Sequence, residues 1–238
     1  MESVWEELKA DHERLFRGPG KVTGGEYNKQ WDAWLKRART TLFPNDTQYW
    51  LPDDSTLWRD SAPLSIVIGG LKVVPESLLA PMLRAAVYDL DPSFNRRYIE
   101  VCLKHWGGVR VNTDLFPYTV GSNLERAGVA NAFYHSLSNP RKGYLFEWTE
   151  GPTKEQIQRA HNWFLEEFVT NSDLQVRRNT ISRLNLDKPE AYPESLRPLI
   201  PRAIAIARNH PDEYIRHRVE IQLGKPGPFM AKPSRGQH

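Results

Sequence analysis

The sequence predicts an all-α protein built from helix pairs that repeat along the chain. Three observations lead to this prediction. Apolar residues recur at helical spacing through most of the 238 residues, while strand signals are sparse. The segment 75–89 (PESLLAPMLRAAVYD) aligns without gaps on 193–207 (PESLRPLIPRAIAIA). Arginines at one position of successive second helices recur about every 40 residues, which is the length of a two-helix repeat.

Composition restricts the class of protein before any motif is considered. With 39% apolar and 26% charged residues, the chain has the composition of a soluble globular protein. The longest apolar run, 64–74, is shorter than the roughly 18 residues that suggest a membrane span. The N-terminus does not show the positive-then-apolar order of a secretory signal. We therefore expect a cytoplasmic protein that does not bind membranes.

Two helices are expected before the repeats. Residues 4–16 open with Ser3-x-x-Glu6, a capping box, and continue with apolar residues at helical spacing. Glycines and a proline at 18–25 end this helix, and a second helix is expected at 26–43. We predict that these helices, within residues 1–45, cap the open end of repeats that span 50–224. The segment 225–238 is rich in Gly, Pro and basic side chains, and this composition predicts a flexible basic tail.

The repeated unit is a helix, a short turn and a second helix. After the two aligned first helices, the second helices are expected at 91–103 and 211–223, and the stretch 172–184 (SDLQVRRNTISRL) is a third copy. These copies align on Arg96, Arg177 and Arg216, each followed seven residues later by a leucine. Arg59 and Arg126 mark two weaker copies. The spacings between these arginines are 37, 30, 51 and 39 residues, with a mean near 40.

This pattern resembles HEAT-like repeats, in which a Pro-started helix, a turn with Asp or Asn and a second helix with an early Asp and Arg follow one another. The resemblance covers about residues 50–224 and is strongest at 75–103 and 193–223. It implies one domain over 1–224, folded as a right-handed αα-superhelix of about five helix pairs. It also implies a structural ladder that connects neighbouring repeats, formed by Arg59, Arg96, Arg126, Arg177 and Arg216.

The sequence contains no motif for catalysis, a cofactor or a metal ion. GPGKVT at 18–23 lacks two of the required positions of a phosphate-binding Walker A loop. The seven histidines are scattered without a close set of further ligands. The single cysteine, Cys102, lies between apolar neighbours and is expected to be a buried thiol. We therefore predict no catalytic residue, no cofactor, no metal and no small-molecule substrate.

Seven residues are candidates for binding a partner. Trp163 lies on the flank of the apolar stripe of its helix, with Arg159 one turn earlier, an arrangement typical of interface anchors and also of packing at the edge of a core. Arg178 has no constant counterpart in the other repeats. If the first helices line the inner surface of the superhelix, they present arginines there. The full set is Arg84, Arg159, Trp163, Arg178, Arg197, Arg202 and Arg208.

An arginine-lined surface would suit an acidic partner, although it is also typical of a solvated face. We predict a non-catalytic protein-binding module that holds a protein on its concave face, for instance a regulatory adaptor or an immunity-type inhibitor. The alternative is nucleic-acid binding, because HEAT-like solenoids include DNA-repair glycosylases. The arginines favour this alternative, and the net charge of only +3 opposes it. A HEAT-like enzyme such as a chromophore lyase is a third possibility.

Overall fold

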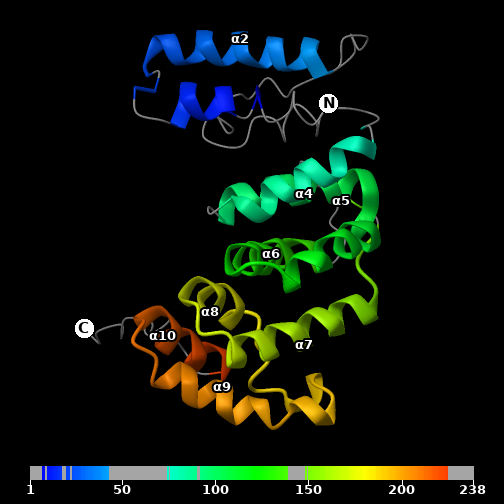
Figure 1. Ribbon diagram of the computed structural model, residues 1–238, viewed down its shortest axis with the longest axis vertical. Helices are drawn as coiled ribbons and strands as arrows, with labels where there is room; N and C mark the ends of the chain where they lie inside the picture. The colour runs from blue at the N-terminus through cyan, green and yellow to red at the C-terminus, as the bar shows by residue number, and fades with distance from the viewer. Residues whose placement is uncertain are drawn as a thin grey trace, which may run out of the picture. The chain divides into compact units, whose positions relative to one another are not determined.

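The computed structural model shows a mainly helical chain (Figure 1). No strand element occurs in the part of the chain that the structure describes, so the all-α prediction is confirmed. No helix in that part is long and apolar enough to cross a membrane. Arg59 and the predicted tail at 225–238 lie outside the described residues, which are 7–8, 10–17, 20–21, 23–42, 74, 76–89, 92–138, 148 and 150–224.

The chain forms two compact units, which are described separately. Unit 1 comprises Met1–Asp114 with His135–Pro152, and unit 2 comprises Leu115–Tyr134 with Thr153–His238. The chain passes from unit 1 to unit 2 after Asp114, returns to unit 1 at His135 and enters unit 2 again at Thr153. The predictions about binding residues fall mostly in unit 2.

Unit 1 begins with the two helical segments expected at its N-terminus. Residues 7–8 and 10–12 are helical and continue into a π-helical turn, Glu13–Arg17. Helix α2, Gly25–Leu42, lies within one residue of its predicted bounds. It buries Trp31, Trp34 and Ala38, whose spacing of three and four residues places them on one face. The ring of His12 packs edge-on against Trp34, with 5.5 Å between ring centroids.

The next helix pair of unit 1 follows the sequence repeat. A 3-10 turn, Glu76–Leu78, leads into α4, Leu79–Tyr88, and α5 spans Pro92–Leu115. The first helical stretch of α5 runs three residues past the predicted end at residue 103 and breaks at Gly107, where φ is 73° and ψ is 164°, and a second helical stretch continues to Leu115. The neighbouring Gly108 allows the chain at 150–152 to pass close by. A Cβ there would lie 2.5 Å from the carbonyl carbon of Gly151. Cys102 on α5 is fully buried, as predicted.

Unit 2 contains two complete helix pairs preceded by a shorter element. A 3-10 helix, η4 (Phe116–Val120), leads into α6, Asn123–Ser136, whose last two residues belong to unit 1. The first pair is α7, Lys154–Thr170, with α8, Leu174–Ile181. The 3-10 turns η5 (Pro189–Ala191) and η6 (Glu194–Leu196) then lead to the second pair, α9 (Leu199–Arg208) and α10 (Glu213–Gln222).

The two helix pairs of unit 2 pack against each other, first helix on first helix and second helix on second helix. Helix α7 contacts both its partner α8 and the next first helix, α9, while α10 contacts α9 and the preceding second helix, α8 (Figure 1). First helices are therefore neighbours, and so are second helices. The core between them consists of fully buried aromatic and aliphatic side chains, including Phe164, Phe168, Val176, Ile215 and Val219.

The sequence repeat corresponds to a repeated local structure. Asp173 and Asp212 are the N-caps of α8 and α10, and each side chain accepts a hydrogen bond from a backbone N–H three residues later. Four residues after each cap, Arg177 and Arg216 donate to the carbonyl oxygens of Asn171 and His210, both at 2.7 Å. The arginine thus closes the turn that joins the two helices of its own pair.

Candidate functional site

An open groove of about 770 Å³ lies on unit 2, between η4 and the exposed face of α7. Helix α7 presents residues at spacings of three and four to the groove, while Phe164 and Phe168 on its opposite face are fully buried. The helix begins at a capping box in which the side chains of Thr153 and Gln156 each accept a backbone N–H of the other residue. Nine residues line the groove: Phe116, Thr119, Lys154, Glu155, Gln158, Arg159, Asn162, Trp163 and Glu166.

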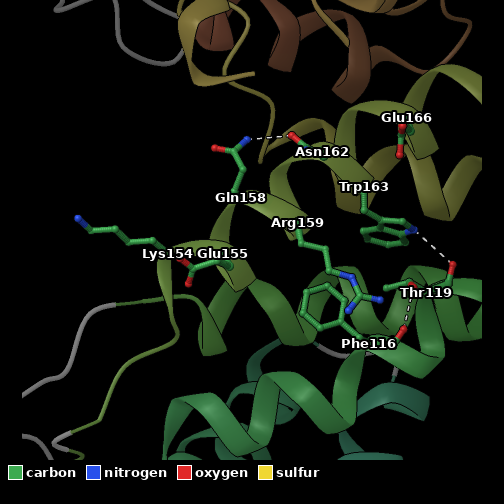
Figure 2. Close-up of a pocket in the computed structure, with 9 residues that line it drawn as sticks. All are labelled: Phe116, Thr119, Lys154, Glu155, Gln158, Arg159, Asn162, Trp163 and Glu166. Atoms are coloured by element: carbon green, nitrogen blue, oxygen red, sulfur yellow. Dashed lines mark hydrogen bonds between the residues drawn. The ribbon is translucent and has the colours of Figure 1, made fainter. Parts of the chain in front are cut away.

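Aromatic side chains form the apolar part of the groove. The guanidinium carbon of Arg159 lies 4.0 Å from the centroid of the Phe116 ring, a cation–π contact (Figure 2). Trp163 is half-buried and donates its indole N–H to the carbonyl of Thr119, at 3.3 Å. Its ring also packs against Phe133 and Phe164. Trp163 therefore belongs to the edge of the core and to the groove wall at once.

The charges along the groove are mixed. Lys154 and Arg159 are basic, while Glu155 and Glu166 are acidic, so the formal charges cancel. Hydrogen bonds to its own backbone N–H and to Thr153 lower the pKa of Glu155, which favours its charged form. Acidic and basic residues thus alternate along the exposed face of α7.

Amide side chains lie along one side of the groove. Gln158 donates to Asn162 at 2.8 Å and to the carbonyl of Ala191 at 2.9 Å. The first contact lies within α7 (Figure 2), and the second connects this helix to η5. Amides offer both donors and acceptors to a bound chain. The groove therefore combines aromatic side chains, charges of both signs and hydrogen-bonding amides.

Of the seven candidate binding residues, the structure brings only Arg159 and Trp163 together in this groove. Arg197 donates to the carbonyl of Tyr192, and Arg208 pairs with Glu220 at 2.8 Å, which connects α9 to α10. Arg202 is exposed on α9. Arg84 lies in unit 1, where its guanidinium is 6.0 Å from the ring centroid of Tyr88.

The predicted ladder arginines make three kinds of contact. Arg96 pairs with Glu100 within α5. Arg126 donates to the carbonyl of Gly121 and to both carboxylate oxygens of Glu167, at 3.0 and 3.1 Å, and so connects α6 to α7. Arg177 and Arg216 bond to the turns of their own pairs.

The expected roles of Arg177 and Arg178 differ from their contacts. We expected Arg177 to join one repeat to the next and Arg178 to be free for binding. Instead, Arg178 on α8 lies 3.7 Å from Asp212, the N-cap of α10, and 5.6 Å from the ring centroid of Tyr214. The physical reason is the direction of the side chains: Arg177 points back over its own helix start, whereas its neighbour points to the following pair.

Sequence analysis missed a second group of basic residues, Arg183, Arg218 and His161, which lie on different segments of unit 2. Their positions are too far apart in sequence for any local pattern to indicate them. Within the described residues, no group of three or more His, Cys, Asp or Glu side chains could hold a metal ion.

Comparison with known proteins gives no family for this chain. No protein-family model matches the sequence, and no curated protein or solved structure matches the chain. The functional argument therefore depends on the geometry of unit 2.

Proposed function

We propose that this protein is a non-catalytic protein-binding module of the HEAT-like class, with its helix pairs stacked in a right-handed αα-superhelix. The packing of α7 on α9 and of α8 on α10 supports this, because stacked pairs of a helical solenoid make such contacts. The ion pair from Arg178 to the N-cap of α10 supports it further, since it links consecutive pairs. First helices would then line the concave face.

The observation that carries the proposal is the groove on the exposed face of α7. A half-buried Trp and an Arg–Phe stack next to open space are the kind of side chains that dominate protein interfaces. Both charge signs and the amide pair favour a polypeptide segment that carries acidic and basic residues. Glu155 and Glu166 would repel a phosphate backbone, which makes the groove less suited to nucleic acid.

The test is affinity capture from the source cell with matched variants. Proteins retained by the wild type should be lost, by about tenfold or more, with Arg159→Glu, because this change reverses a groove charge and removes the stack on Phe116. The control is Arg110→Glu, which makes a similar charge reversal on the exposed side of α5.

A second arm separates the alternative function. Duplex DNA is titrated at about 50 and 200 mM salt, a range over which backbone binding loses several orders of magnitude in affinity. If DNA is bound with this salt dependence and the loss follows Arg159→Glu, the module binds nucleic acid. If Arg159→Glu and Arg110→Glu retain the same proteins, the groove is not the binding surface and the proposal is wrong.

A further inference from the structure

Two arginines of unit 2 lie on facing segments, and neither has an acidic partner among the described residues. Arg183 follows α8, and Arg218 is in α10. Gln222 donates its side-chain amide to the carbonyl of Ser182 at 3.2 Å. Since Gln222 is one helical turn after Arg218 and Ser182 directly precedes Arg183, this contact holds the two arginines on facing segments. Their charges interact, because Arg218 contributes to a lowered pKa of Arg183, after the larger effect of burial.

The guanidinium of Arg183 is held in place but is short of acceptors. Its Nη2 donates to the carbonyl of Tyr134 at 2.8 Å, and its carbon lies 3.3 Å from the centroid of the Tyr134 ring. Its Nε–H is buried and has no hydrogen-bond partner. Burial, and to a smaller extent the positive charge of Arg218, lower the pKa of Arg183 to about 10.

Arg218 is also short of hydrogen-bond acceptors. Its Nε–H is also buried without an acceptor, and no hydrogen bond or ion pair joins it to any described residue. By contrast, Arg178 and Arg208 of the same unit have Asp212 and Glu220 as partners. A half-buried pair of like charges costs free energy unless an opposite charge compensates it. No acidic side chain of the described residues therefore compensates the positive charges of the arginine pair.

We propose that Arg183 and Arg218 together bind a phosphate group. Two guanidinium groups carry two positive charges, and a phosphate dianion compensates both, whereas a carboxylate compensates one. Guanidinium N–H groups also match the oxygens of a phosphate in planar, two-point hydrogen bonds. Arg183 uses only Nη2 for the carbonyl of Tyr134, so its Nη1 and both Nη groups of Arg218 remain available as donors.

His161 is placed to report on this site. It lies 3.5 Å from the side-chain nitrogen of Asn185, and the charge of Arg183 acts on it. Burial and then Arg183 lower the pKa of His161, so the imidazole is neutral at pH 7.5 and the arginine pair keeps its double charge. A bound phosphate opposes the effect of Arg183 and should raise the pKa of His161. This shift reports binding without any assay of function.

The phosphate group could come from two sources: a free phosphate ion, or a phosphorylated side chain of a protein partner. The site does not depend on the groove of α7, and its test is separate from that of the proposed function. Full-length protein is titrated with inorganic phosphate at pH 7.5 and constant ionic strength, in parallel with O-phosphoserine and with acetate. Calorimetry gives the affinity, and the NMR titration of His161 gives its pKa.

Three variants make the test specific. Arg218→Gln should weaken phosphate binding at least tenfold, because it removes one charge-assisted contact and half of the local charge. Arg218→Lys keeps the charge but loses the planar donors, so an intermediate affinity is expected. Arg110→Gln removes an exposed cation that pairs with Asp114 and Glu76 in unit 1, and this variant should bind phosphate like the wild type.

Melting temperatures show that the variants are folded and add a second readout. Without phosphate, Arg218→Gln should melt no lower than the wild type, because it removes a repulsion; with phosphate, only the wild type, Arg218→Lys and Arg110→Gln should gain. Tighter binding of phosphoserine than of phosphate supports the site and indicates a phosphorylated partner; the reverse supports it and indicates the free ion. An equal response to acetate, equal binding by Arg218→Gln, or no saturable response to either phosphate compound overturns the proposal.

Discussion

At the scale of single residues, the ion pair of Arg126 with Glu167 has the most buried carboxylate among the described ion pairs between helices of unit 2. The Glu167 side chain is only 7% exposed, and its carboxylate accepts hydrogen bonds from Arg126 Nη1 and from the side-chain amide of Asn171. Replacing Arg126 with Met leaves this carboxylate buried with one donor fewer. We expect the free energy of unfolding to fall by about 2–3 kcal/mol, measured by urea denaturation.

A matched variant isolates the effect of burial in this prediction. Arg96→Met removes an arginine from an exposed pair within α5, and such pairs contribute about 0.3–0.5 kcal/mol. Adding Glu167→Gln to Arg126→Met should restore part of the lost stability, because the buried charge is then gone. Equal losses for Arg126→Met and Arg96→Met would mean that Arg126 is not a structural connection between α6 and α7.

The residue scale also shows where sequence reasoning is effective and where it fails. Arg159 and Trp163 are one turn apart on one helix, so their proximity follows from helical periodicity alone. Phe116 and Thr119 complete the groove from about 40 residues earlier in the chain, and only the packing of η4 on α7 brings them there. The juxtaposition of Arg183 and Arg218 has the same cause, since the segment after α8 and helix α10 meet only in the folded chain.

At the scale of elements, the N-caps Asp173 and Asp212 satisfy backbone N–H groups at the starts of the second helices α8 and α10. Asp212 accepts a backbone N–H of α10 and also attracts Arg178 from α8, whereas Asp173 has only the capping role among the contacts of its carboxylate. Asp173→Ala should cost about 1 kcal/mol, the usual value of a lost cap. Asp212→Ala should cost more, because it also removes the link to the preceding pair.

The double variant Asp212→Ala with Arg178→Ala tests this difference. If the ion pair accounts for the larger loss, Arg178→Ala should change the stability less in the Asp212→Ala background than in the wild type. Chemical denaturation of the four proteins gives the coupling directly. Equal losses for Asp173→Ala and Asp212→Ala, together with no coupling, would contradict a role of Arg178 between the pairs.

Element ends were harder to predict than elements themselves. The repeat in sequence predicted both first helices, because helical periodicity depends on neighbouring residues, but it did not predict the 3-10 turns Glu76–Leu78 and Glu194–Leu196 that precede α4 and α9. The prediction failed for α5, which was expected to end at residue 103. The first helical stretch runs on to Gly107, whose non-helical backbone interrupts α5, and a second stretch continues to Leu115. The reason is tertiary: Gly108 bonds to the carbonyl of Glu150, far along the chain.

At the scale of the whole molecule, two histidines of unit 2 link folding to pH. Burial lowers the pKa of His161 and of His210, with the charges of Arg183 and of Arg177, respectively, as the next cause. The neutral Nδ1 of His210 accepts the backbone N–H of Asp212 at 3.1 Å, and this bond is lost on protonation. An unfolded histidine takes up its proton near pH 6.5, before the folded one does, so acid favours the unfolded chain.

Stability should therefore be full above pH 6.5 and should fall as the pH drops from 6.5 towards 5.5, with a slope of at most about 1.4 kcal/mol per pH unit for each histidine. Urea denaturation at pH 7.5, 6.5 and 5.5 measures this, in phosphate-free buffers so that the arginine pair stays unoccupied. His210→Asn provides the control, because an amide oxygen can still accept the Asp212 N–H but does not titrate. Its pH dependence should be shallower than that of the wild type. A stability that stays constant or rises over this range would show that neither histidine is held neutral by the fold.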